Sequence, residues 1–343
     1  MPELRKDPTI GRWVIISTER ARRPGVFFDR DDNTEEEQDC PFCEHKEDQT
    51  PLEIHAIRSA GARANDPGWK VRVIPSINPF LRIEGNLNRR GYGLYDVMNG
   101  VGAHEVIVET PQHIANIADL SAPQIELVLQ THALRINDLE KDPRFKYVLA
   151  YKNYGHLSGG GRIRHSRSQL IATPVTPVRV KEELVIAKKY FEFHDRCIYC
   201  DMIRQESEAK ARIVAECEHF IALTPFASRF TFEVWILPKK HGCDFAKANT
   251  QGYHNLAVIL KNVLSKIKAG LNDPAYNFLI HSAPFRRHSG KGHQWKTIEE
   301  DYHWHLEIIP RLTRVAGFEK GTGFYICSIP PEETAKFLRE VPI

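Results

Sequence analysis

Apolar and polar residues follow two different periods along this chain, and each period occurs twice. Two stretches, HEVIVE at 104–109 and FEVWIL at 232–237, alternate apolar and polar side chains, which is the pattern of half-buried β-strands. Two longer stretches, at 123–140 and 251–271, place apolar residues at the spacing of an amphipathic helix. An Asp-Pro pair follows each helical stretch, and proline after a helix end stops the helix. The pattern predicts strands, one main helix and further strands, in that order and twice over.

Other landmarks repeat in the same order. A Cys-x-x-Cys pair precedes the strands in each half, as CPFC at 40–43 and CIYC at 197–200. A later strand begins near HSRSQ at 165–169 in the first half and near HWHLE at 303–307 in the second. The intervals between landmarks differ, as expected when insertions fall in loops. We infer that the chain contains two copies of one unit.

Intervals within the unit suggest its register and its boundaries. Glu105 and Glu233 each lie eight residues before a histidine, so we predict that they occupy equivalent positions. We predict an N-terminal repeat over residues 1–178 and a C-terminal repeat over residues 179–343, with a helical middle in the joint at 176–196. Strands mixed with one main helix per unit favour the α+β class with mainly antiparallel sheets.

Composition argues against several classes of protein. The chain has 343 residues and a formal net charge of +3, so no overall field points to nucleic acid or to a membrane surface as a partner. No stretch approaches 18 consecutive apolar residues, and the charged start, MPELRKDPTIGRW, lacks the apolar core of a secretion signal. We therefore expect a protein that is not secreted. Seven cysteines in an intracellular chain argue against a disulfide framework.

The two cysteine pairs require a metal or a redox explanation. A thioredoxin-like pair usually opens a helix after a strand, whereas each pair here follows a charged loop. Each pair is followed by one histidine after a strand and by another at the head of a later strand, and two thiolates with two imidazoles form a closed tetrahedral zinc site. We therefore predict two zinc ions per chain. The predicted ligands are Cys40, Cys43, His113 and His165 in the first repeat and Cys197, Cys200, His241 and His303 in the second. Cys217, Cys243 and Cys327 are predicted to be ordinary small buried residues.

Longer motifs give the chain a resemblance to a known family. They are RKDPTIGRWVIIS at 5–17, RRP at 22–24, GAHEVIVETPQH at 102–113, GHLSGGG at 155–161 and HWHLEIIPRLTRVAGFEKGTGFYI at 303–326. With them the chain resembles, over nearly its whole length, the galactose-1-phosphate uridylyltransferase family of the histidine-triad superfamily. The likeness is greatest to the ADP-glucose phosphorylase branch. The resemblance implies two tandem histidine-triad-like repeats, each a mainly antiparallel sheet with a packed helix.

The resemblance also implies an activity and a set of site residues. Family members move a nucleoside monophosphate between a nucleotide sugar and a sugar phosphate or phosphate, by way of a covalent adduct on the second histidine of an H-x-H-x-Q motif. Gln169 stands in the place of the glutamine, which can donate a hydrogen bond to a phosphate oxygen. The nucleotide contacts implied for this chain are Asn78, Asn153, Gly159, Gly160 and Gly161. Backbone amides of a glycine turn approach a phosphate without obstruction.

The resemblance leaves the second metal open. Some uridylyltransferases hold iron through a glutamate and three histidines, which would here be Glu183, His281, His303 and His305. His303 cannot easily serve both sites. The intact pair of Cys197 and Cys200 favours zinc.

The motif departs from the family at its centre. It reads H-S-R-S-Q, so the nucleophile position holds Arg167, and a guanidinium stays protonated and has no lone pair for attack. One alternative is a binding-only pseudoenzyme. Another is a transferase or a histidine-triad-like hydrolase that uses His305, the residue equivalent to Arg167 in the second repeat. Glu307 in the place of the glutamine opposes that alternative, because a carboxylate repels phosphate. The blander interpretation is that His305 packs near the second metal.

The family likeness implies a partner and a range of substrates as well. We expect a cytoplasmic homodimer in which the segment at 314–326 completes the pocket of a neighbouring subunit. Uridine and adenine nucleotides are both candidates, and UDP-glucose with a sugar phosphate would place the chain in galactose metabolism.

Overall fold

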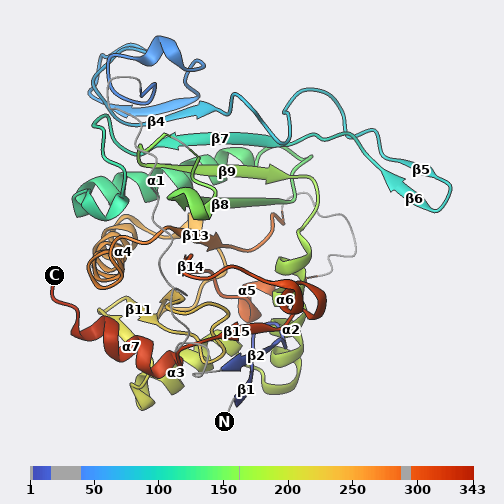
Figure 1. Ribbon diagram of the computed structural model, residues 1–343. Helices are drawn as coiled ribbons and strands as arrows, with labels where there is room; N and C mark the ends of the chain where they lie inside the picture. The colour runs from blue at the N-terminus through green and yellow to red at the C-terminus, as the bar shows by residue number, and fades with distance from the viewer. Residues whose placement is uncertain (1–2, 17–39, 162, 287–294) are drawn as a thin grey trace.

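The computed structural model describes residues 3–16, 40–161, 163–286 and 295–343. The RRP motif at 22–24 lies outside the described residues. The fold is built around one large antiparallel sheet, with helices on both of its faces (Figure 1). It therefore confirms the predicted α+β class.

Ten strands form this central sheet. In spatial order they are β10 (Ile213–Glu216), β11 (Phe220–Leu223), β12 (Val234–Pro238), β14 (His305–Pro310), β13 (Tyr276–His281), β8 (Tyr147–Tyr154), β9 (Arg167–Thr173), β7 (Ala103–Val108), β4 (Trp69–Pro75) and β3 (His55–Arg58). β8 and β13 pair at the centre, and the two halves have matching strand orders when read outward from them. This symmetry supports the duplication. The boundary between residues 178 and 179 stays a prediction, because the sheet is continuous across the two halves.

Two long helices cover one face of the sheet. They are α1 (Ala122–Leu139) and α4 (Thr250–Gly270), close to the predicted ranges 123–140 and 251–271. Ser121 and Asn249 each accept a hydrogen bond from an amide in the first turn, which explains where the two helices begin. The helices pack against each other, and their apolar faces form the main core with both halves of the sheet.

The opposite face is covered differently in the two halves. In the second half it is covered by α2 (Val178–His194), α3 (Ile198–Ala209) and α5 (Ile298–Asp301), and side chains of α2 are buried with those of β12. The predicted helical joint is thus confirmed as α2. In the first half a loop around Phe42 covers β4 and β7, whereas β8 and β9 keep half-exposed side chains on this face. The face of β8 and β9 is therefore the open part of the sheet among the described residues.

Two sequence-based expectations about strands are corrected here. β7 and β12 were expected to be half-buried, but nearly all their residues are buried, because both of their faces are covered. The predicted equivalence of Glu105 and Glu233 is also wrong by one residue. In the ladders Val106 is paired with Gln169 and Trp235 with Glu307, so Trp235 corresponds to Val106. The turn that leads from the strand to the histidine is one residue shorter in the second repeat, which misled the comparison.

Smaller elements surround the sheet. A second sheet contains β1 (Glu3–Lys6), β2 (Trp13–Ile16) and β15 (Tyr325–Cys327), and a hairpin contains β5 (Arg90–Tyr92) and β6 (Tyr95–Val97). The other helices are α6 (Gly317–Thr322) and α7 (Pro331–Glu340), with 3-10 turns η3 (Glu47–Gln49), η4 (Ile117–Asp119), η5 (His156–Ser158) and η6 (Phe245–Lys247). Within the described ranges, no helix has both the length and the apolar character that a membrane span requires.

Candidate functional site

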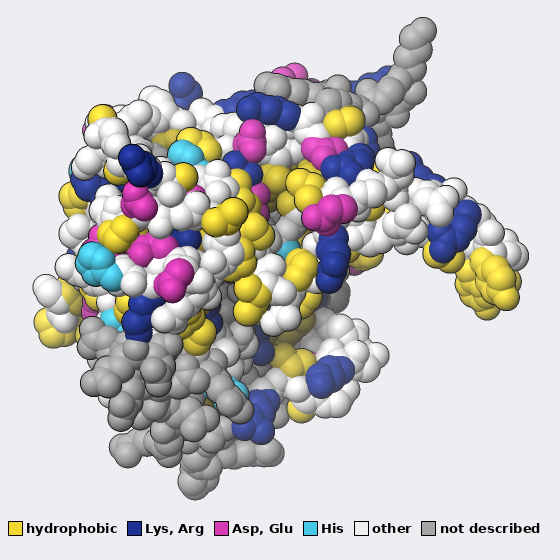
Figure 2. Space-filling view, turned by 90° about the horizontal axis from the view of Figure 1, so that it is seen from above, with side chains coloured by type: hydrophobic (Ala, Val, Ile, Leu, Met, Phe, Trp, Pro, Cys, Tyr) yellow, Lys and Arg dark blue, Asp and Glu magenta, His cyan; other side chains and the backbone are white. Residues whose placement is uncertain are grey.

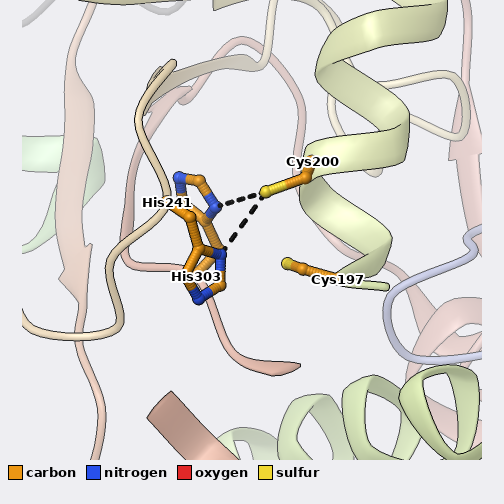
Figure 3. Close-up of side chains that lie close together, drawn as sticks. All are labelled: Cys197, Cys200, His241 and His303. Atoms are coloured by element: carbon orange, nitrogen blue, oxygen red, sulfur yellow. Dashed lines mark hydrogen bonds between the residues drawn. The ribbon is translucent and has the colours of Figure 1, made fainter. Parts of the chain in front are cut away.

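The cysteine pair of the second repeat meets both of its predicted histidines (Figure 3). Cys197 caps the start of α3, and Cys200 lies in the first turn of that helix. The Sγ atom of Cys200 lies 3.4 Å from Nδ1 of His241 and 3.6 Å from Nδ1 of His303. Potential ligand atoms of all four residues lie within 4.8 Å of one another. This pair does open a helix, as a thioredoxin-like pair does, but it follows α2 and not a strand, and the convergence of two histidines fits a metal rather than a redox pair.

The hydrogen bonds around this cluster fix the tautomer and the orientation of the two histidines. Nε2 of His241 lies 2.9 Å from the carbonyl oxygen of Glu299, and Nε2 of His303 lies 2.9 Å from that of Pro238. A carbonyl accepts only, so each Nε2 carries the proton and each Nδ1 turns its lone pair toward the thiols. The hydrogen bond from Cys197 lowers the pKa of Cys200 to about 3, while the pKa of Cys197 is raised. The donor set fits one zinc ion.

The set of candidate metal ligands in the first repeat is less complete. Potential ligand atoms of Cys40, Cys43 and His113 lie within 4.8 Å of one another, and Cys43 Sγ lies 3.4 Å from His113 Nδ1. The fourth predicted ligand, His165, packs its ring 5.6 Å from that of His113 but does not join this group. His165 is buried, its Nε2 has no hydrogen-bond partner, and burial lowers its pKa to about 4. A neutral imidazole with an unpartnered buried nitrogen is a suitable metal ligand.

Arg167, at the family's nucleophile position, lies against the glycine-rich turn. Its guanidinium donates to the backbone carbonyls of Gly160, Ile163 and His165, with Nη1 2.6 Å from the oxygen of Ile163. Its Cζ atom also lies 5.4 Å from the ring centroid of Phe42, which is a cation–π distance. Arg167 therefore ties the turn to β9.

Backbone amides that were predicted to bind phosphate form hydrogen bonds within the glycine-rich turn itself. The amide N–H groups of Gly159 and Gly160 donate to the carbonyls of His156 and Gly155. Gly159 and Gly161 have positive φ angles of 86° and 72°, and a Cβ on Gly160 would stand 2.7 Å from the oxygen of Gly155. Glycine is thus required by the fold of the turn. Of the three amides, those of Gly159 and Gly160 are not free for a phosphate in this arrangement.

An open pocket lies beside the turn and contains several basic groups. Residues of the turn line it together with Asn153, Arg164, His165 and Arg167, and the space, open to solvent, is about 500 Å³. The amide of Asn153 accepts a hydrogen bond from Asn277, 2.7 Å away, which fixes its side chain. Gln169 lies two residues further along β9 on the same face as Arg167. Asn78 lies exposed in the loop after β4.

The equivalent face of the second repeat holds a closed cluster of charges. Glu183 of α2 gathers there with His281, His305 and Glu307, and all four are buried. His281 lies between two carboxylates, with Nδ1 3.0 Å from Glu183 and Nε2 3.5 Å from Glu307. Arg179 and Arg229 lie within 3.0 Å of Glu307. Glu183, His281 and His305 therefore lie together as the iron alternative implies, but His303 turns to the cysteines instead.

Neighbouring opposite charges stabilise the ionised groups of this buried cluster. Burial alone would lower the pKa of His281, but the carboxylates of Glu183 and Glu307 outweigh it and raise that pKa to about 9. Burial would raise the pKa of Glu307, yet Arg229 and His281 lower it to about 2. Burial lowers the pKa of His305 to about 4, and its ring stacks 5.1 Å from Trp235 and 4.8 Å from His281. His305 is thus packed and neutral, as the blander interpretation expects, and it does not line the open pocket of the first repeat.

Several residues near the sites were missed in the sequence. His104 and Tyr151 both contact the side chain of Gln169, and Arg229 neutralises Glu307. Position 151 could have been found from strand alternation alone, since it shares a face with Asn153. Nothing in the sequence around Arg229 marks it. Of the three cysteines predicted to be buried, Cys243 and Cys327 are buried, but Cys217 is partly exposed.

Known families and known proteins match this chain over nearly its whole length. Residues 183–324 match the family described as galactose-1-phosphate uridyl transferase, C-terminal domain, and residues 93–174 match the N-terminal domain of DUF4931, a domain of unknown function. The whole chain is 36% identical to ADP-glucose phosphorylase of Arabidopsis thaliana, covering 93% of it, and 28% identical to galactose-1-phosphate uridylyltransferase of Thermotoga maritima, covering 99% of it. A crystal structure of the Arabidopsis enzyme with bound ADP-glucose has a TM-score of 0.84 at 35% identity, covering 100% of both chains. A uridylyltransferase structure has a TM-score of 0.75 at 27% identity, covering 99% of this chain and 98% of that one.

Proposed function

Because the chain belongs to the galactose-1-phosphate uridylyltransferase family, we propose that it binds a nucleotide sugar on the open face of its first repeat and is a nucleotidyltransferase of that type. The transferred group would be a nucleoside monophosphate, and the acceptor a sugar phosphate or phosphate. The observation that carries this proposal is the pocket between the glycine-rich turn and β9, where Asn153, Arg167 and the turn come together beside Gln169.

Arg167 decides how far the family's chemistry applies to this chain. In the family route a histidine nitrogen attacks the α-phosphorus, a P–N bond forms, and the bond to the departing sugar phosphate breaks. A guanidinium cannot supply the electron pair. We propose that the first step is lost or severely slowed at this position, while binding of the nucleotide is retained.

The test is the substitution Arg167→His. We expect it to create or restore turnover and a covalent nucleotidyl adduct, detected as radiolabelled nucleotide retained after denaturation. Assays would pair UDP-glucose with galactose 1-phosphate and ADP-glucose with phosphate, and would thereby separate uridine from adenine specificity. A chain that forms the adduct with Arg167 in place would overturn this part of the proposal.

A binding-only pseudoenzyme is the second candidate, and the contacts of Arg167 favour it. Its guanidinium donates to three carbonyls of the turn region and so holds the pocket in shape, while its positive charge lies in the lining where a phosphate would bind. If this candidate is right, Arg167→Ala weakens phosphate binding by roughly 1.5–3 kcal/mol, the range for a hydrogen bond to a charged group. Burial of His305 beneath α2 opposes the third candidate, a transferase or hydrolase built on the second repeat.

We also propose two zinc ions per chain with structural roles. The support is the repeated set of two cysteines and two histidines, complete in the second cluster and with His165 adjacent in the first. The Glu183 cluster supports iron less well, because both nitrogens of His281 face carboxylates and Glu307 is already neutralised by arginines.

A cytoplasmic homodimer is proposed as well. It is supported by the family likeness and by an arm that carries exposed apolar residues. The arm connects β4 to β7 and contains the β5–β6 hairpin, which projects from the body (Figures 1 and 2). Tyr92, Leu94 and Tyr95 at its tip are 76%, 86% and 62% exposed. A neighbouring subunit would cover them, and the segment at 314–326 is the proposed contribution to its pocket.

A further inference from the structure

The side chain of His104 joins two segments that contain residues of the proposed site, the loop with Asn78 and the strand with Gln169. On one side, the backbone N–H of Phe80 lies 3.3 Å from His104 Nδ1. On the other side, His104 Nε2 lies 2.8 Å from Oε1 of Gln169. His104 is 7% exposed, and it belongs to β7, which lies beside β9 in the sheet. The ring is therefore a buried bridge between the loop after β4 and the glutamine on β9.

The directions of these hydrogen bonds fix the form of the imidazole. A backbone N–H can only donate, so Nδ1 of His104 must accept and carries no proton. The proton of the neutral ring is then on Nε2, which donates to Gln169 Oε1. A charged ring would carry protons on both nitrogens and would lose the contact with Phe80. His104 thus acts as an acceptor toward the loop and as a donor toward the glutamine.

Gln169 receives a second hydrogen bond at the same oxygen. The hydroxyl of Tyr151 lies 2.9 Å from Oε1, and the ladder of β8 and β9 pairs Tyr151 directly with Gln169. Two donors on one oxygen hold the amide in a single orientation, with the NH₂ group on the opposite side. Among the described residues, no hydrogen bond uses that NH₂ group, so it is available to an acceptor in the site.

The loop after β4 is held by the same residue in three ways. The backbone N–H of Ser76 donates to the carbonyl of His104 at 2.9 Å, and that of Phe80 donates to its side chain. The ring of Phe80, although largely exposed, lies 4.9 Å from the imidazole at an angle of 30°. Asn78, the residue proposed to touch the nucleotide, lies between these two anchors. The position of Asn78 therefore depends on His104.

We propose that His104 and Tyr151 are positioning residues of the first-repeat site. Tyr151 and His104 turn the amide of Gln169 so that it presents NH₂, and not oxygen, to a phosphate, and His104 also places the loop that receives the nucleoside. This inference rests on the proposed function, in which a nucleotide occupies that face. It explains how one neutral side chain aligns the two ends of a nucleotide site.

The second repeat offers an internal comparison. Its equivalent of Gln169 is Glu307, and the ladder pairs Glu307 with Leu279, which has no hydroxyl. Glu307 is instead bound by Arg179 and Arg229. The pair of donors on a glutamine oxygen is thus a feature of the open face and not of the repeated fold.

Two substitutions of His104 separate its two roles. In His104→Asn the amide oxygen can replace Nδ1 and keep the Phe80 contact, but the bond to Gln169 is lost. In His104→Gln the amide nitrogen can replace Nε2 and keep the bond to Gln169, but the Phe80 contact is lost. The measurement is calorimetric affinity for UDP and ADP and for the nucleosides uridine and adenosine.

The variants fall into two groups by their expected effect on binding. His104→Asn and Tyr151→Phe should weaken diphosphate binding several-fold while nucleoside binding stays the same, and the double variant should weaken it about tenfold or more, as a lost charge-assisted hydrogen bond implies. His104→Gln should weaken nucleoside and diphosphate binding by the same factor. The controls are His254→Asn, at a surface contact with Glu126, and Tyr253→Phe, which removes a hydroxyl bond to the carbonyl of Phe245 in the core beneath α1 and α4.

The outcomes distinguish a failure of the proposed function from a failure of the positioning roles of His104 and Tyr151. If the unmodified protein binds none of the four probes, the proposed function fails and the inference falls with it. If the unmodified protein binds a nucleotide but all variants bind it equally, or if Asn and Gln at position 104 have the same profile, only the positioning roles are wrong. Equal unfolding midpoints for the variants and controls would show that the affinity changes do not come from a general loss of structure.

Discussion

The two repeats present the same strands to opposite environments. On β8 and β9 the first repeat has Tyr151, Asn153, Arg167 and Gln169 on a half-exposed face. At the equivalent positions on β13 and β14 the second repeat has Leu279, His281, His305 and Glu307, of which the last three are buried. One backbone arrangement therefore supports an open polar pocket in one copy and a closed charge cluster in the other.

The covering helix accounts for the difference. α2 follows β9 directly in the chain and lies over the second repeat, where Arg179 and Glu183 reach Glu307 and His281. A buried charge is tolerated only when it is paired, and each charge of this buried cluster has an opposite charge beside it. The open face has no such requirement and can keep hydrogen-bonding groups for a ligand. Duplication thus yields one pocket and one core from the same unit.

The largest expected effect comes from breaking the metal clusters. Cys200→Ser should remove one of two zinc ions per chain and lower the free energy of unfolding by several kcal/mol or prevent folding, because structural zinc contributes directly to folding. Cys43→Ser should also remove one zinc ion but cost less, since only three ligands of the first cluster converge. Elemental analysis and thermal unfolding check both, with Cys217→Ser as the control. Zinc near zero in the unmodified protein would exclude the proposed clusters.

A reciprocal exchange between the repeats has the next largest effect. Glu307→Gln leaves Arg229 and His281 without their buried carboxylate and should cost about 3–5 kcal/mol of unfolding free energy. Gln169→Glu changes a half-exposed residue, so it should change stability by less than about 1 kcal/mol. It should nevertheless abolish nucleotide binding, because a carboxylate repels phosphate. Denaturant unfolding and calorimetry measure the two effects, and equal stability losses would contradict the comparison.

Short-range patterns made much of the fold predictable. The helices α1 and α4 and the repeated order of cysteines and histidines depend on local spacing, and the structure has them close to where the sequence indicated. The equivalence of Glu105 and Glu233 failed because it measured distance along a turn whose length differs, and a slip of one residue moves a side chain to the other face. Glu105 in fact binds Arg135 of α1, whereas Glu233 binds Arg229.

The parts of the site that could not be predicted depend on contacts between distant segments. The covering of the second repeat by α2, the occupation of the turn's carbonyls by Arg167 and the bridge made by His104 each join residues that no local pattern connects. The glycine-rich turn was identified from its composition, but composition does not tell which amides the turn uses for itself. Long-range geometry decides these points, and one sequence carries no signal for it.

The pH dependence of stability gives a smaller effect that is specific to the second repeat. The pKa of His281 is raised from 6.5 to about 9, so its charge stabilises the fold fully below pH 6.5, and this contribution is lost as the pH rises through 9. His305 and Glu307 do not titrate in that window, because their pKa values are lowered to about 4 and about 2. Unfolding free energy should therefore fall by about 3 kcal/mol from pH 6.5 to above pH 9.

Two variants test whether this loss comes from His281. His281→Gln should flatten the decline between pH 6.5 and 9, while Asn153→Ala, at the equivalent position of the first repeat, should keep it. Denaturant unfolding at a series of pH values gives the slopes. An unchanged slope in His281→Gln would assign the decline to other groups.

The smallest effect on stability is expected from the arm, which only the first repeat has. The connection from β4 to β7 spans residues 76–102, whereas the one from β11 to β12 spans residues 224–233. Leu94→Ser changes a side chain that is 86% exposed, so the free energy of unfolding of one subunit should change by no more than about 0.5 kcal/mol. If the arm contacts a second copy of the chain, the same change should weaken the dimer, which light scattering over a dilution series measures. Val258→Ser, on the exposed side of α4, is the matched control, and equal dilution profiles for the two variants would remove the arm from the proposed interface.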